Sequence, residues 1–142
     1  MKRKRLLRFY FFSDSLNAAL DNLITETALV SMNGERGGEY YAEKICGLLG
    51  VKCNLSELWN YLDGVMRGFT EKETAALKYY GATREGLSVI PENARRAVRS
   101  AAMKFTRKAR HIYKYPRGIE LVNASYYCLI SVKKACCGKP GT

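Results

Sequence analysis

Apolar residues recur every three or four positions along most of the chain, which is the spacing of amphipathic helices. This spacing predicts a helix over roughly residues 14–30 and a long helix over residues 39–68. The apolar phase of the long helix continues through Gly47 and Gly50, and a separate second helix would have no reason to keep that phase. A break around residues 50–54 is the alternative.

Start and stop signals divide the second half of the chain. Thr70 and Glu73 form a capping-box sequence that begins a short helix, and Gly81 supplies its left-handed stop. Pro91 is suited to the first turn of a helix and opens another one, over roughly residues 91–113. The connection between these two helices has room for one helical turn.

The last predicted helix covers roughly residues 117–133, after Pro116. Its predicted inward-facing residues are Ile119, Val122, Tyr126 and Ile130. Residues Tyr126–Val132 would equally suit a strand by propensity. The whole pattern predicts an all-α, five-helix single domain, in which a long antiparallel helix pair carries a smaller basic part.

The helix predicted at 91–113 combines a narrow apolar stripe with a strongly cationic face. Its apolar residues fall within a sector of about 100°, and no acid occurs between Asn93 and Ile119. The nine basic residues of this segment are Arg95, Arg96, Arg99, Lys104, Arg107, Lys108, Arg110, Lys114 and Arg117. Because solvated helices usually mix charges of both signs, this pattern indicates a face that meets phosphates.

The net charge of +11 is unevenly distributed along the chain. Residues 1–8 hold five bases, and residues 9–69 hold eight acids against four bases. Residues 70–142 hold fifteen bases against five acids. Solubility does not require this asymmetry, whereas an anionic partner explains it.

This distribution also suggests how the chain is organised. Residues 1–8 are predicted to form a basic arm that is mobile or is ordered only against a partner, and residues 9–135 a single helical domain. Within that domain, residues 9–69 form a scaffold and residues 70–135 a basic, helix-turn-helix-like half. Residues 136–142 form a loose tail.

Candidate catalytic and metal-binding chemistry is sparse. His111 is the only histidine, and it is expected to be a surface imidazole. The acids of the first two helices form no obvious facing pair, so the sequence predicts neither an enzyme nor a cofactor. Cys128, Cys136 and Cys137 lie near one end, but adjacent cysteines suit tetrahedral zinc poorly.

The remaining cysteine and hydropathy signals concern location. Five cysteines without framework spacing indicate free thiols in a reducing cytoplasm. No apolar stretch approaches the roughly 20 residues needed to span a bilayer, and a membrane partner is not expected.

The run from Leu62 to Tyr80 resembles the opening of sigma-factor region-four modules and related phage regulators. In that family a capped helix of the form L-x-x-x-E-x-x-V-L-x-x-x-Y is followed by a glycine, a short helix and a basic recognition helix. The matching positions are Phe69, Glu73, Ala76, Leu77, Tyr80 and Gly81. The family's middle helix has no counterpart in Ala82–Ile90.

The resemblance implies a transcription regulator with RNA polymerase as a partner. It places the helix from Pro91 in the recognition position, with Arg95, Arg96, Arg99 and Ser100 near the reading end.

The sequence therefore predicts a nucleic-acid-binding protein, with DNA favoured over RNA. The predicted contact residues are Arg95, Arg96, Arg99, Arg107, Lys108, Arg110 and Lys114, with Lys2, Arg3, Lys4 and Arg5 of the arm. Arg95 and Arg99 are the candidates for base edges. The alternative is a helical protein–protein interaction module, in which the basic face docks an acidic protein and the long helix serves self-association.

Overall fold

A computed structural model describes the backbone of residues 3–33, 38–82 and 90–137, with side chains up to Tyr126 except that of Asn33. Nearly all of these residues are helical and none forms a strand, which confirms the all-α prediction. They form six α-helices rather than five. The elements are α1 Arg3–Phe11, α2 Ser13–Asn33, α3 Gly38–Met66, α4 Glu71–Ala82, α5 Glu92–Ala109, the 3₁₀-helix η2 Arg110–Lys114, and α6 Pro116–Cys137.

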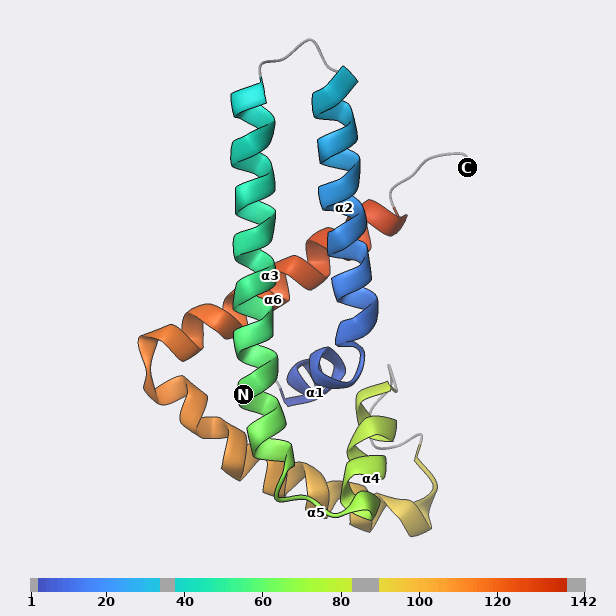
Figure 1. Cartoon of the computed structure of the whole chain (residues 1–142). Helices are drawn as coiled ribbons and strands as arrows, with labels where there is room; N and C mark the ends of the chain where they lie inside the picture. Colours follow the sequence, from blue (N-terminus) through green and yellow to red (C-terminus); the bar gives the residue numbers. More distant parts are fainter. Residues whose placement is uncertain (1–2, 34–37, 83–89, 138–142) are drawn as a thin grey trace.

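Helices α2 and α3 form a long antiparallel hairpin, which α6 crosses at about its mid-height (Figure 1). Helix α3 passes Gly47 and Gly50 without interruption, so the single long helix is confirmed and the break around residues 50–54 is wrong. A Cβ atom added at either glycine would meet nothing within 4 Å. Both positions therefore face open space, and the helix continues through them undisturbed.

The first helix, α1, occupies the segment where a mobile arm was expected. Leu6, Leu7 and Phe9 are buried, with at most 2% of each side chain exposed. They pack against α4, where a Cβ atom on Gly81 would lie 3.4 Å from Leu7 Cβ. Burying three large apolar side chains outweighs the cost of ordering a short basic helix.

Tyr10, at the end of α1, fixes this helix to α3. Its hydroxyl donates to Asp63 Oδ1 at 2.7 Å, and its ring stacks on Trp59 with centroids 5.3 Å apart. The Trp59 indole donates to the Tyr10 carbonyl oxygen at 3.0 Å. Burial and the Asp63 carboxylate raise the pKa of Tyr10 to about 12.

The apolar stripe of the basic helix is buried as predicted. Its buried residues are Val98, Ala101, Ala102, Phe105 and Ala109. The helix is shorter than expected, because α5 ends at Ala109 and the chain continues as η2 instead of remaining α-helical to residue 113. Pro91 is the residue before the first helical position.

Helix α6 corrects the prediction for the end of the chain. Residues Tyr126–Val132 are helical, so the strand alternative is wrong. Ile119 was predicted to face inward but is 41% exposed, whereas Leu121 is only 5% exposed. The buried face of α6 includes Gly118, which lies so close to Ile112 that no Cβ atom fits between them, and Ile119 falls outside this face. The side chain of Ile130 and the backbone of residues 138–142 lie outside the described residues.

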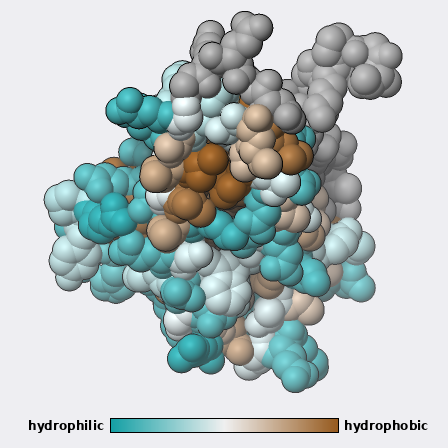
Figure 2. Space-filling model, turned by 45° about the horizontal axis from the view of Figure 1, so that its top comes forward, coloured by the Kyte–Doolittle hydropathy of each residue, from teal (hydrophilic) through white to brown (hydrophobic). Residues whose placement is uncertain are grey.

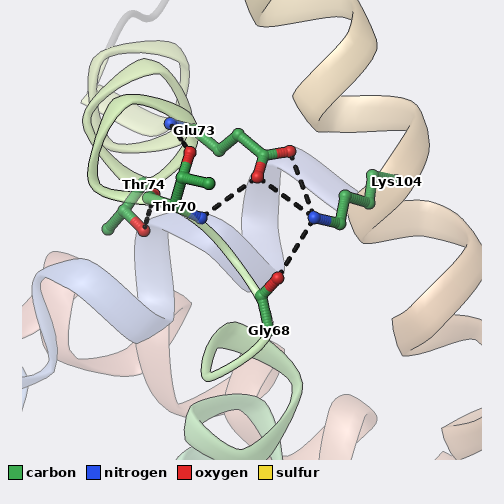
Figure 3. Close-up of polar contacts among 5 residues, drawn as sticks. All are labelled: Gly68, Thr70, Glu73, Thr74 and Lys104. Atoms are coloured by element: carbon green, nitrogen blue, oxygen red, sulfur yellow. Dashed lines mark hydrogen bonds and ion pairs between the residues drawn. The ribbon is translucent and has the colours of Figure 1, made fainter.

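The capping box at the start of α4 is confirmed (Figure 3). The Glu73 amide donates to Thr70 Oγ1 at 3.2 Å, and the Thr70 amide donates to Glu73 Oε1 at 3.0 Å. Lys104 of α5 donates to the same carboxylate at 3.0 Å and to the Gly68 carbonyl oxygen at 3.1 Å. Lys104 therefore joins α5 to the turn before α4. The hydrogen bond from the Thr70 amide is the largest cause that lowers the pKa of Glu73 below its usual value, and the hydrogen bond from Lys104 is the next.

The predicted stop at Gly81 is one residue early, since α4 continues to Ala82.

Thr70→Ala is expected to destabilise the protein by about 1 kcal/mol, the usual effect of losing a cap. Glu73→Gln keeps a capping side chain but loses the pair with Lys104. Because the Glu73 pKa is lowered on folding, its contribution is present above pH 4.5 and is lost as the pH falls through the folded-state pKa. Urea unfolding should show Glu73→Gln as more destabilising at pH 7 than at pH 3. An equal effect at both values would contradict this account.

Candidate nucleic-acid interface

Arginines line the solvent side of α5, opposite the buried stripe. Arg96, Arg99 and Arg107 of α5 are exposed, and so are Arg110 and Lys114 of η2. Within the described part of the chain, no carboxylate forms an ion pair with any of these five residues. We call these five residues the basic face. The structure thus brings together on one side five of the predicted contact residues.

Helix stability does not explain the whole basic face. Cations stabilise the last turn of a helix, where Arg107 lies, because the backbone dipole is negative there. Arg96 and Arg99 lie beyond the first turn of α5, where the dipole contributes little to the stability of a charged side chain. An external anion would favour cations at both ends of the helix.

Other cations of the acid-free segment have partners within the protein. Lys104 pairs with Glu73, and Arg117 of α6 pairs with Glu57 of α3 at 2.8 Å. The Glu57 carboxylate raises the pKa of Arg117. Arg95 was predicted to read base edges, but its Nε donates to the Ile90 carbonyl oxygen at 2.8 Å and the residue is only half-exposed.

The cations of α1 contact the body of the protein instead of forming a free arm. Arg5 lies over the Tyr126 ring at 3.5 Å, and Lys4 lies over the Tyr80 ring at 5.5 Å. Arg3 donates to the Thr106 hydroxyl at 3.4 Å. These contacts attach α1 to α4, α5 and α6, and Lys2 lies outside the described residues.

A groove of about 730 Å³ runs between the end of α3 and the end of α5. We call it the α3–α5 groove. Asn60, Tyr61 and Gly64 line it from α3, and Arg107, Lys108 and His111 line it from α5 and η2. His111 is exposed, as predicted. Sequence reasoning missed Asn60, Tyr61 and Gly64. The available signal was Gly64, which leaves the last turn of α3 without a side chain at this position.

The described residues offer little else for chemistry. They contain no group of three or more metal-ligating side chains. Cys46 and Cys53 are exposed and free, while the side chains of Cys128, Cys136 and Cys137 lie outside the described residues. None of the described helices is both long and apolar enough to cross a bilayer.

Comparisons with known proteins give no relative. No protein-family model matches the chain, and neither a curated protein nor a solved structure is similar to it.

Proposed function

We propose that this protein binds nucleic acid through the basic face of α5 and η2. The observation that carries the proposal is the set of five exposed cations, Arg96, Arg99, Arg107, Arg110 and Lys114, for which no described carboxylate serves as a partner. Arg96 and Arg110 are separated by about 21 Å along the helix at 1.5 Å per residue. That length spans roughly six phosphates of one DNA strand, which rise 3.4 Å each.

The sigma-factor resemblance makes DNA and transcription regulation the favoured setting. The capping box on which part of this resemblance rests is formed, with both reciprocal hydrogen bonds. The segment that would hold the middle helix of a helix-turn-helix lies largely outside the described residues. RNA polymerase remains the partner that the resemblance suggests. Two exposed free thiols suit the reducing cytoplasm in which such a protein would act.

A salt titration tests this function. Binding to a fluorescent 20-base-pair DNA is measured by anisotropy between 50 and 300 mM salt. Five phosphate contacts predict a slope of about −4.5 in log affinity against log salt concentration. Absence of binding at 50 mM salt would contradict the proposal.

A second candidate function, a protein interaction module, is favoured by the far end of the α2–α3 hairpin. Several large apolar residues are exposed there, each by at least 46%, namely Leu29, Val30, Met32, Tyr40 and Leu49. Figure 2, in which the top of Figure 1 comes forward, shows hydrophobic residues gathered on this side of the molecule. Contiguous apolar surface of this kind marks interaction sites.

The charges favour a second copy of this chain as the partner that covers these exposed apolar residues. Residues 25–52 hold four acids and three bases, although the whole chain carries +11. Two hairpin ends can therefore meet with little repulsion, while their basic faces stay apart. Two helices about 10 Å wide, in contact over about 20 Å, cover roughly 400 Å² per copy. Because a standard interface covers about 800 Å² per partner, we expect a weak dimer.

Sedimentation velocity between 5 and 500 μM should therefore show a reversible monomer–dimer equilibrium. A Val30→Asp/Leu49→Asp variant is expected to remain monomeric, because each dimer would bury unpaired charge. Ile119→Asp, a change at an exposed position of α6, should leave the equilibrium unaltered. A wild-type protein that is monomeric at every concentration would contradict the self-association. Dimerisation without any nucleic-acid binding at low salt would favour the interaction module.

A further inference from the structure

The α3–α5 groove differs chemically from the basic face beside it. One wall carries Arg107, Lys108 and His111, all exposed. The residues that α3 contributes to the lining include Tyr61, Val65 and Asn60. The groove therefore combines cations from α5 and η2 with an aromatic ring, an apolar side chain and an amide from α3.

Glycines keep this groove open. A Cβ atom at Gly64 would meet nothing within 4 Å, so a larger side chain there would extend into free space. At Gly68, the ammonium group of Lys108 occupies the position that a side chain would take. Glycine in a helix interior costs about 1 kcal/mol relative to alanine. Gly64 therefore leaves room beside α5 at a cost in helix stability, whereas Gly68, in the turn after α3, leaves room for the Lys108 side chain.

The aromatic wall is held in a fixed position. The Tyr61 hydroxyl donates to the Ala109 carbonyl oxygen at 3.5 Å, and burial raises the pKa of this tyrosine. The ring is thus anchored at its far end to α5 and stays neutral at physiological pH. Arg107 belongs both to this groove and to the basic face, so a ligand can lie across both.

We propose that the α3–α5 groove holds one unpaired nucleotide of the bound nucleic acid. This inference rests on the proposed function. Arg107 and Lys108 would bind the phosphate, the base would lie against Tyr61 and Val65, and Asn60 would hydrogen-bond its edge. A base stacked inside a duplex cannot reach a side wall of this kind. The groove therefore selects single strands, loops or extruded bases, whether in DNA or in RNA.

The test fills the groove without changing any charge. Gly64→Leu should weaken binding of a single-stranded 12-mer about tenfold, the effect expected from losing one stacked base. The slope against salt should stay the same because no phosphate contact is removed. Binding of the 12-mer duplex should change less than twofold. The same 12-mer as DNA and as RNA shows which sugar is preferred.

One variant provides the control. Gly47→Leu places the same side chain on the same helix, far from the groove, and should leave every affinity unchanged. Unchanged single-strand affinity in Gly64→Leu would overturn the groove proposal while leaving nucleic-acid binding intact. If the wild type binds no nucleic acid at 50 mM salt, the proposed function itself fails.

Discussion

Replacing Arg96, Arg99, Arg107 and Arg110 together with glutamine should lower the affinity for DNA by roughly 10²–10³-fold at 50 mM salt. Each arginine that neutralises a phosphate adds about 0.9 to the steepness of the salt dependence, so the slope should become shallower by about 3.6. The fold should survive, because all four side chains are exposed and no described carboxylate pairs with them. Anisotropy titrations over the salt series measure both quantities.

The matched control removes four positive charges from other exposed sites. This control variant replaces four other exposed cations with glutamine and has the same net charge as the arginine variant. The replaced residues lie on α3, on the turn after it and on α4, outside the basic face; they are Lys44, Arg67, Lys72 and Lys78. Its affinity should fall far less. Equal losses in the two variants would show that overall charge, and not the basic face, attracts the nucleic acid.

Local apolar spacing explains which helices could be predicted. The stripe on α5 and the capping box of α4 depend on residues within a few turns of one another, so the sequence displays them directly. Helix α1 was missed because residues 1–8 hold five bases and only two leucines, a composition typical of a solvated arm. Leu6, Leu7 and Phe9 are nevertheless buried, since α4 offers them a complementary surface at Gly81. Only the tertiary contact reveals that surface.

The same distinction holds for the candidate site. Helical geometry placed Arg96, Arg99, Arg107 and Arg110 on one face, and the structure agrees. Helical geometry could not show that Lys104 and Arg117 are paired, because their partners lie 31 and 60 residues away in the sequence. The α3–α5 groove could not be predicted from the sequence either, because it exists only where the end of α3 passes α5.

Gly118 is the position where a single methyl group should have the largest effect on stability. A Cβ atom there would overlap the Ile112 carbonyl oxygen and lie 2.7 Å from Ile112 Cγ1. Ile112 is itself buried in η2, with 4% of its side chain exposed, so it has little room to move. Gly118→Ala should therefore destabilise the protein by about 3 kcal/mol, at the upper end for overpacking.

Gly47→Ala is the control, because the same substitution has the opposite sign where space is open. No atom lies within 4 Å of a Cβ at Gly47, so alanine there should stabilise α3 by about 0.5–1 kcal/mol. Urea unfolding followed by circular dichroism measures both variants. A Gly118→Ala protein within 0.5 kcal/mol of the wild type would show that η2 and α6 are not in the contact described. Because Lys114 of the basic face belongs to the same short helix η2 as Ile112, disturbing this contact should also weaken nucleic-acid binding.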